Sequence, residues 1–474
     1  MQRIMWLGEI HKEDVAKVGG KGANLGEMFN AGFNVPKAFV VTTDMYFDFM
    51  GQKGLVEPIR ELLEKVDVNN SFELNAVSEM IANLFDKTVT PLDMQKEIGK
   101  AYHTMTAGQM SRVAVRSSAT AEDQPDASFA GQQATFLNVT EVLGVNKAVK
   151  ACWASLFTPR AIFYRVQHGY DHFTAGVAVV VQTMIQSKVS GVMFTVDPAT
   201  SDNTKMVIEA VWGLGEGIVS GKYTPDTYTF NRVSGQVDNI SITRQEKCIA
   251  GTEGGPHEIM VKADWQIRMK LSLDQILGLA KMGVQAEDHY GKPQDIEWAL
   301  CDDKLYMLQT RPITTLDAKA KPSEDIGYEI ITEEAVNKIA NEIISDNFSN
   351  NFSKGAKAQP SAPEKENHKC LATGVTASKG IAKGKVVVVK DATHLDDVKK
   401  GDVMVTETTD PDYVPAMKRA SAIITNTGGR TCHAAIVSRE LGIPCIVNTK
   451  NGTTVLTDGM MVEVNATEGK VYGA

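Results

Sequence analysis

The chain has 474 residues, of which 43% are hydrophobic and 23% are charged, and its formal net charge is -9 at pH 7. This length predicts several domains at about 150 residues each, and the composition is typical of globular proteins. The negative charge argues against a general nucleic-acid-binding function. Because no apolar run is long enough to span a bilayer and the first residues contain no signal core, we expect a cytoplasmic protein with no membrane partner.

The cysteines are scattered along the chain without CxxC spacing, which argues against a zinc site and against a disulfide framework. They are Cys152, Cys248, Cys301, Cys370, Cys432 and Cys445. Cys432 precedes His433 at an expected helix start, where a thiolate would be stabilised. The sequence alone leaves open whether Cys432 is reactive or is a small residue that fills a turn.

The first motif lies between Val18 and Met28, where four glycines surround Lys21 and a helix-like pattern follows. Glycines allow the backbone to approach a ligand closely, and a lysine among them supplies a charge for phosphate. The spacing is not that of a Walker A loop. By itself the motif is compatible with phosphate binding or with a plain glycine-rich turn.

Two strands further along carry polar residues that suit a nucleotide site. Arg116 ends the alternating segment Val113–Val115 and could bind a phosphate with both guanidinium nitrogens, or could pair with Glu122 at the surface. A small-residue turn containing Gly131 and Thr135 follows, and loops of this kind can close over a nucleotide. Gln182 lies near the end of the apolar strand 177–184, which could line an adenine or could be a plain core strand.

Residues 294–312 predict a hairpin of two alternating strands with a turn at Asp302 and Asp303. Asp295 and Glu297 are two residues apart on one strand, and Gln309 and Arg311 are two apart on the other. Two carboxylates, an amide and a guanidinium could bind magnesium and a triphosphate, or could form a salt-bridged surface. The earlier segment Ile208–Gly217 lacks the glycine spacing of a dinucleotide fingerprint, so a Rossmann fold is rejected.

The composition changes after the hairpin, and a polar segment rich in lysine and glutamate is typical of a flexible linker. We expect domains at 1–315 and 370–474, joined by the linker 316–369. In the second domain, the apolar strand 422–425 is followed by Gly428 and Gly429 and by a helix from Ala434 to Leu441. This pattern places His433 in the first turn of a helix, where anions are stabilised. His433 is therefore a candidate phosphohistidine carrier.

Several of these segments resemble the phosphoenolpyruvate synthase (pyruvate, water dikinase) family. The similar stretches are the opening GGK, VAVRSSATAEDQPDASFAGQQATFLNV, DIEWAL with LYMLQTRPI, and TNTGGRTCHAAIVSRELGIP. The resemblance implies an α/β fold of the α+β kind, with an ATP-grasp-type nucleotide-binding domain linked to a small swivelling phosphohistidine domain. It covers nearly the whole chain except the linker, which is longer than expected.

The resemblance also implies residue roles and a reaction. His433 would be phosphorylated, Lys21, Arg116, Gly131, Thr135, Gln182 and Arg311 would bind ATP, and Glu297 and Gln309 would hold Mg2+. The implied enzyme is a kinase with paired acceptors that converts ATP, pyruvate and water into AMP, phosphoenolpyruvate and phosphate. Thr431, next to the signature cysteine, is either a regulatory phosphorylation site or a helix-capping hydroxyl.

About 110 residues after the linker leave no room for the pyruvate-binding barrel of the family, so we expect the barrel on a separate partner chain. Three alternatives remain. One is a phosphotransferase for another small acceptor, such as the rifampin phosphotransferases, and another is a dikinase that uses phosphate. The third is a non-catalytic nucleotide-binding interaction protein, which the joint presence of Lys21, Arg116, Glu297 and His433 disfavours.

Overall fold

The computed structural model describes residues 2–68, 70–109, 111–120, 123–124, 127–128, 134–252, 255–313, 370–430 and 432–473. The described chain divides into two compact units. The first comprises Met1–Lys188, Ile249–Ile259 and Glu297–Arg311, and the second comprises Val189–Cys248, Met260–Ile296 and Pro312–Ala474. The expected linker 316–369, Gly131 and Thr431 lie outside the described residues, and the domain boundaries 1–315 and 370–474 stay a prediction.

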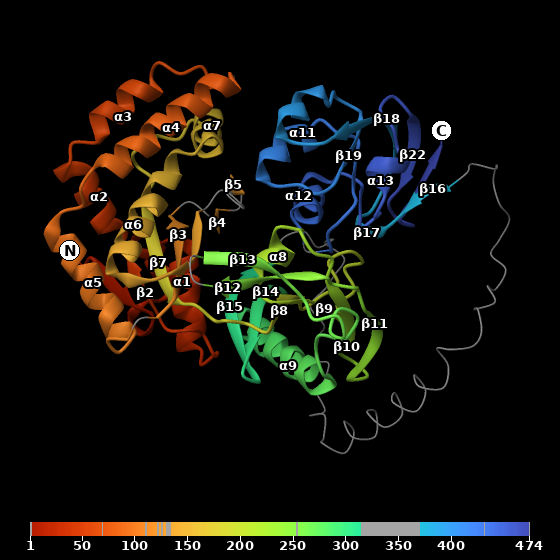
Figure 1. The fold of residues 1–474 in the computed structure, drawn as a ribbon, viewed down its shortest axis with the longest axis horizontal. Helices are drawn as coiled ribbons and strands as arrows, with labels where there is room; N and C mark the ends of the chain where they lie inside the picture. The colour runs from red at the N-terminus through yellow and green to blue at the C-terminus, as the bar shows by residue number, and fades with distance from the viewer. Residues whose placement is uncertain are drawn as a thin grey trace. The chain divides into compact units, whose positions relative to one another are not determined.

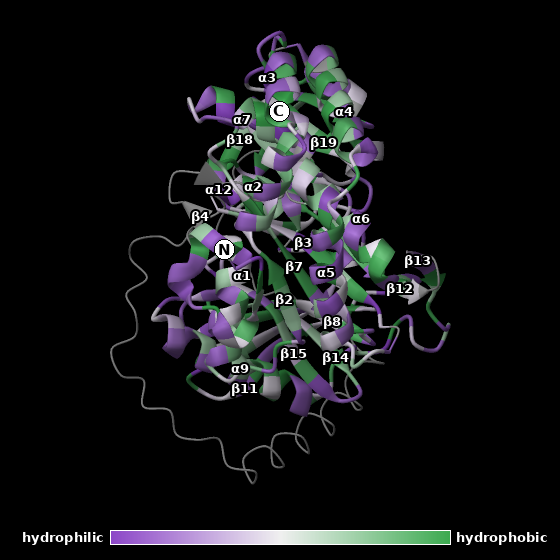
Figure 2. Cartoon of the chain, turned by 90° about the vertical axis from the view of Figure 1, so that its left-hand side faces the viewer, coloured by the Kyte–Doolittle hydropathy of each residue, from purple (hydrophilic) through white to green (hydrophobic). Residues whose placement is uncertain are grey.

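The first unit is built on a five-stranded antiparallel sheet with the order β1-β2-β7-β3-β6 (Figure 1). The strands are β1 (Ile4–Trp6), β2 (Ala38–Val41), β3 (Val113–Ala119), β6 (Thr135–Val139) and β7 (Val177–Thr183). Valine-rich, β-branched sequences favour such buried strands. Figure 2 shows β2, β3 and β7 as largely hydrophobic ribbons inside this unit.

Helices cover both faces of this sheet. They are α1 (Val15–Asn30), α2 (Thr43–Gln52), α3 (Val56–Leu63), α4 (Ser71–Lys87), α5 (Leu92–Met105), α6 (Glu141–Ala154) and α7 (Pro159–Gln167). Val113, Val115 and Val179 point into a core that also contains Phe49 and Trp153. The alternate residues of the strands face the opposite side, which carries α1.

Several shorter elements lie wholly or mostly in the first unit. They are the two-stranded pairs β4 (Asp123–Gln124) with β5 (Ala127–Ser128) and β12 (Lys247–Thr252) with β13 (Gly255–Met260), and the hairpin strands β14 (Gln294–Cys301) and β15 (Lys304–Pro312). Asp302 and Asp303 form the hairpin turn with φ values of 49° and 56°. Two successive left-handed residues are typical of a tight hairpin turn. The expected hairpin is therefore confirmed.

The second unit contains four neighbouring antiparallel strands in the order β11-β10-β9-β8. These are β8 (Val189–Phe194), β9 (Lys205–Trp212), β10 (Asp226–Asn231) and β11 (Gln236–Ser241), with helices α8 (Glu216–Val219) and α9 (Leu273–Tyr290). Ser272 caps α9 through the backbone N–H of Gln275, and left-handed Gly291 ends it.

The second unit also contains an eight-stranded sheet with the order β16-β23-β22-β18-β19-β20-β21-β17. Its elements are β16 (Cys370–Thr373), β17 (Val375–Ser378), β18 (Ile381–Val389), β19 (Val403–Thr406), β20 (Ala422–Thr425), β21 (Cys445–Val447), β22 (Met461–Asn465), β23 (Lys470–Gly473), α11 (Val414–Met417), α12 (His433–Leu441) and α13 (Gly452–Val455). The segment β18-β19-β20-β21 is parallel. Val403 and Met404 point into separate cores on the two faces, and α12 packs on the face of Met404.

The fold is thus mixed α/β, as expected. Among the described residues, short 3-10 segments connect its elements: Leu7–Glu9, Lys12–Asp14, Ser155–Phe157, Ala392–Asp397 and Pro411–Tyr413. Within the described part of the chain, none of the helices has both the length and the apolar character needed to cross a membrane.

Candidate functional site

The glycine-lysine motif forms a kinked turn inside α1. Gly19 has φ +70°, a left-handed conformation that interrupts the helix just before Lys21. A Cβ atom at Gly19 would lie 2.1 Å from the backbone oxygen of Ser118 on β3, so only glycine fits. The Ser118 hydroxyl accepts from Gly22 N–H at 3.0 Å and donates to the Val18 carbonyl at 2.8 Å. Lys21 is therefore held on the α1 face of the sheet by a serine that the sequence analysis did not identify.

The strand register brings the other predicted nucleotide residues of this unit to the same face. Arg116 on β3 lies opposite Val180 on β7 and Thr135 on β6, and Ala114 lies opposite Gln182. Directly opposed residues share a face, and Arg116 is a diagonal neighbour of Gln182. The face of the sheet that carries α1 and Lys21 therefore also carries Arg116, Thr135 and Gln182.

Arg116 carries a feature of a ligand-binding residue. Its Nε atom is buried and has no hydrogen-bond partner among the residues that the structure describes. A buried guanidinium nitrogen without a partner is costly, and a phosphate oxygen would satisfy it. The described surroundings of Arg116 thus fit an anionic ligand.

The hairpin strand β15 is tied to α1 and to the segment that follows it. The Asn24 side-chain amide donates to the Thr310 carbonyl, which lies between Gln309 and Arg311. Asn34 donates from Nδ2 to the Leu305 carbonyl at 2.6 Å and accepts from Met307 N–H at 3.0 Å. These contacts place β15 beside the helix that carries Lys21. The structure thereby brings the lysine motif and the predicted Gln309–Arg311 segment together, which the sequence alone did not show.

The expected magnesium ligands are Glu297 and Gln309, both half-buried in the hairpin. Among the residues described, no group of three or more His, Cys, Asp or Glu side chains could hold a metal ion by itself. Mg2+ is commonly bound through one or two carboxylates together with substrate phosphates and waters, and the Glu297 carboxylate and the Gln309 amide oxygen are donors of the right kind. The donor chemistry of Glu297 and Gln309 therefore fits a magnesium ion that arrives with a nucleotide.

His433 occupies the expected position in the second unit. Strand β20 ends at Thr425, Gly428 turns the chain with φ +106°, and His433 is the first residue of α12. Helix α12 ends at left-handed Gly442, as the sequence predicts. The His433 Nδ1 atom lies 2.9 Å from the Thr409 hydroxyl oxygen, and the imidazole is half-buried. Thr409 is a second residue that the sequence analysis missed, because only the fold brings the loop after β19 to α12.

Cys432 is the N-terminal flanking residue of α12 and is buried. Burial raises its pKa to about 11, although the backbone N–H groups of Ala435 and Ala434 act in the opposite direction. The thiol is therefore protonated at neutral pH. These surroundings do not support a reactive Cys432 thiolate. The Cys432 side chain instead fills the turn beside Gly428, since a Cβ atom added to Gly428 would lie 2.8 Å from the Cys432 sulfur.

Sequence comparison places both regions in known families. Residues 15–329 match the pyruvate phosphate dikinase AMP/ATP-binding domain, and residues 398–469 match the mobile domain of PEP-utilising enzymes. The chain is 45% identical to a probable phosphoenolpyruvate synthase of Archaeoglobus fulgidus, over 99% of this chain and 58% of the relative.

Two further relatives show similar identity and coverage. A probable phosphoenolpyruvate synthase of Methanothermobacter thermautotrophicus is 43% identical over 99% of this chain and 63% of its own length. The phosphoenolpyruvate synthase of Pyrococcus furiosus is 43% identical, with coverages of 99% and 58%. The chain thus spans about three fifths of these relatives. With its two domain matches, it belongs to the family of enzymes that carry the pyruvate phosphate dikinase AMP/ATP-binding domain.

Proposed function

We propose that this chain is an ATP-dependent phosphotransferase that phosphorylates its own His433 as part of phosphoenolpyruvate synthesis. The observation that carries the proposal is the placement of His433 as the first residue of α12, with Nδ1 against the Thr409 hydroxyl. The segment 398–469 around it matches a mobile domain of PEP-utilising enzymes. The first turn of a helix is also the positive end of the helix dipole, which favours a phosphoryl group on a histidine in this position.

We infer the reacting imidazole nitrogen from the contact with Thr409, with the ring Nδ1–H as the donor. The tautomer in which Nδ1–H donates to the Thr409 oxygen leaves the lone pair on Nε2. This is the tautomer that a nucleophilic imidazole needs, and Thr409 holds the ring in a fixed orientation. We therefore propose that the new N–P bond forms at Nε2 of His433.

The nucleotide would bind on the α1 face of the first sheet, in a domain of the ATP-grasp type. Lys21, Arg116 and Arg311 would neutralise phosphate charge, and Thr135 and Gln182 would contact the rest of the nucleotide on the same face. Glu297 and Gln309 would hold Mg2+, which supplies charge neutralisation for the transferring phosphoryl group. Gly131 is proposed for the same site from the family resemblance alone.

The complete reaction would consume ATP, pyruvate and water and release AMP, phosphoenolpyruvate and phosphate. A histidine that serves both ATP and pyruvate has to reach near-contact geometry at each of them. We therefore propose that the phosphohistidine domain swivels between two positions. Pyruvate is the proposed acceptor because the relatives are named phosphoenolpyruvate synthases.

Isotope labelling tests the first half of this reaction. Incubation with Mg2+ and ATP labelled at the β-phosphate, with γ-labelled ATP in parallel, should give acid-labile label on a peptide that contains His433. His433→Ala should remove the label. His394→Ala is the matched control, because His394 lies in the same domain at the surface and pairs with Asp391. Equal labelling of the His433→Ala variant would refute the proposed mechanism.

A chase experiment tests the acceptor. The labelled chain is mixed with pyruvate, with and without a second polypeptide that carries the part of the Archaeoglobus fulgidus relative beyond this match. Transfer of label to phosphoenolpyruvate only with the second polypeptide would support a separate barrel chain as partner. Retention of the label in both mixtures would argue against pyruvate as the acceptor.

A further inference from the structure

Two carboxylates of the second unit meet the loop that precedes His433. Glu209 on β9 accepts a hydrogen bond from the backbone N–H of Arg430 at 2.9 Å. The Arg430 guanidinium lies 3.5 Å from Asp197, which follows β8. Glu209 is 1% exposed and Asp197 is 6% exposed. A buried carboxylate is costly unless it is paired, and these contacts with the histidine loop contribute to the pairing of both residues. Asp197 also accepts a hydrogen bond from Ala199 N–H at 2.9 Å.

The fit between the two segments is close. A Cβ at Gly429 would lie 2.9 Å from both the Glu209 carboxylate and the Pro225 ring, so the second glycine of the motif permits the approach. Thr427 donates from its hydroxyl to the Gly221 carbonyl at 3.1 Å. We use the name docking seat for Asp197, Glu209 and the segment Gly221–Pro225. The loop contacts this seat mainly through backbone and polar atoms.

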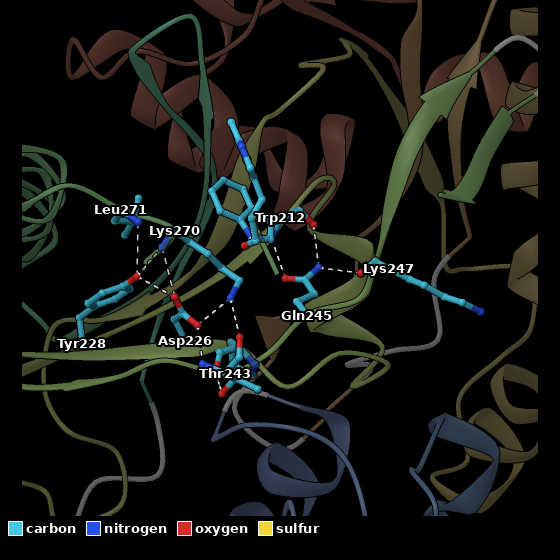
Figure 3. Close-up of polar contacts among 10 residues, drawn as sticks. Trp212, Asp226, Tyr228, Thr243, Gln245, Lys247, Lys270 and Leu271 are labelled. Carbon is cyan, nitrogen blue, oxygen red and sulfur yellow. Dashed lines mark hydrogen bonds and ion pairs between the residues drawn. The ribbon is translucent and has the colours of Figure 1, made fainter. Parts of the chain in front are cut away.

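A buried polar network supports one side of the docking seat (Figure 3). Asp226, directly after Pro225, pairs with the Lys270 ammonium at 2.6 Å, and both side chains are fully buried. The Tyr228 hydroxyl donates to the second Asp226 oxygen at 3.0 Å, and Thr243 N–H donates to the first at 2.8 Å. A buried network with every member paired is rigid. It fixes the backbone position of Pro225 against the histidine loop.

We propose that Glu209 and Asp197 are positioning residues that dock the loop 427–430 and thereby hold His433 in a fixed orientation for phosphoryl transfer. The proposal rests on the function proposed above. The chemistry suits reversible docking, because carboxylates and backbone groups are readily hydrated when the loop leaves, whereas an apolar interface of the same kind would resist opening. Glu209 is thus a candidate docking residue and not a catalytic one.

A disulfide trap measures docking without any requirement for activity. A Cβ at Gly221 would lie 3.2 Å from the Cys432 Cβ, close to the separation of about 3.5–4.5 Å found in disulfides. Gly221 has φ +70°, so Gly221→Cys adds backbone strain, and the buried Cys432 thiol reacts slowly. In the full chain carrying Gly221→Cys, prolonged incubation with diamide at mildly alkaline pH should therefore link residues 221 and 432, and peptide mass spectrometry identifies the link. Thr224→Cys with Asn448→Cys is a second trap, because the native side-chain oxygens are 3.4 Å apart.

Substitutions of Glu209 test the docking seat, both in the chains that carry the cysteine traps and in the chain without them. Glu209→Ala should slow trapping, and slow labelling of His433, by about 10- to 100-fold, because a charge-assisted hydrogen bond is lost. ATP affinity should be unchanged. Glu209→Gln keeps an acceptor oxygen and should restore most of the rate. Glu246→Ala is the matched control, since Glu246 lies at the surface of the same unit and pairs with exposed Arg244.

The outcomes separate this inference from the proposed function. Equal trapping rates in the parent and in Glu209→Ala would overturn the docking seat, as would failure of both cysteine pairs to form a link. If the parent traps but ATP does not label His433, the proposed function fails while the trapping rates still decide the role of Glu209.

Discussion

The kink at Gly19 in the first unit, which we call the lysine loop, and the turn at Gly428 in the second, which we call the histidine loop, share a structural feature. Each contains a left-handed glycine, with φ +70° at Gly19 and +106° at Gly428, and each leads into helical residues that carry the functional side chain. Each is also held by a hydroxyl from another strand or loop. The difference lies in what the hydroxyl contacts: Ser118 binds the loop backbone, whereas Thr409 contacts the imidazole itself.

This difference indicates separate roles for the two loops. A backbone contact fixes the shape of a loop, and we propose that Lys21 then supplies charge to a ligand. A contact with the ring orients the imidazole itself. We therefore propose that the lysine loop binds the ligand and that the histidine loop accepts a phosphoryl group, although their sequences share a glycine-rich start.

Replacing Gly19 and Gly428 should give the largest losses of stability, and the two losses should differ. Gly19→Ala would push a Cβ to 2.1 Å from a backbone oxygen of β3, whereas Gly428→Ala would meet only the Cys432 side chain at 2.8 Å. We expect the free energy of unfolding to fall by roughly 3–5 kcal/mol for Gly19→Ala and by about 1–3 kcal/mol for Gly428→Ala. Native-state hydrogen exchange of α1 and α12 measures both losses.

Two variants control for the cause of these losses. Gly32→Ala has φ +85° with no atom within 4 Å of the new Cβ, so it isolates the backbone strain, about 1 kcal/mol. Adding Cys432→Ala to Gly428→Ala should recover part of the loss because the contacting sulfur is gone. If Gly19→Ala costs no more than Gly32→Ala, the close approach of α1 to β3 is incorrect.

The sequence predicts these two loops well because their information is local. Strand β20 has the expected bounds, and α12 begins one residue before the expected start, since apolar periodicity and the glycine and proline signals agree there. Ser118, Thr409 and Glu209 were not predicted. Their roles depend on contacts across 96, 24 and 221 residues of sequence, which no local pattern encodes. A lone carboxylate inside the buried strand β9 was the one available signal for Glu209.

The two hydroxyl latches should give intermediate and distinguishable effects. Ser118→Ala removes the contacts with Gly22 and Val18 and should weaken ATP affinity by about 10-fold, with little change in the labelling rate at saturating ATP. Thr409→Val should leave ATP affinity unchanged and lower the rate of His433 labelling by about 10-fold, because the ring loses its orienting partner. Nucleotide titration and single-turnover labelling separate the two quantities.

Thr409→Ser provides the control for this pair, because it keeps the hydroxyl and should retain most of the labelling rate. A Thr409→Val variant that binds ATP weakly but labels normally once saturated would reverse the roles assigned to the two latches.

Cys432 should show the smallest effect, although it adjoins His433. Cys432→Ala should change the labelling rate by less than about twofold, since a thiol with a pKa of about 11 supplies no charge at neutral pH. The folded thiol has a higher pKa than the ordinary value of 9.0, so the unfolded state loses its proton first. The contribution of the Cys432 thiol to the free energy of unfolding is therefore present below pH 9 and is lost as pH rises to about 11. Cys432→Ala should make stability fall less steeply over this pH range.

Alkylation tests the protonation state of the thiol directly. Iodoacetamide at pH 8 should modify exposed Cys370 before buried Cys432. Rapid alkylation of Cys432 in the folded chain would instead indicate a thiolate, and the helix start would then have two nucleophiles rather than one.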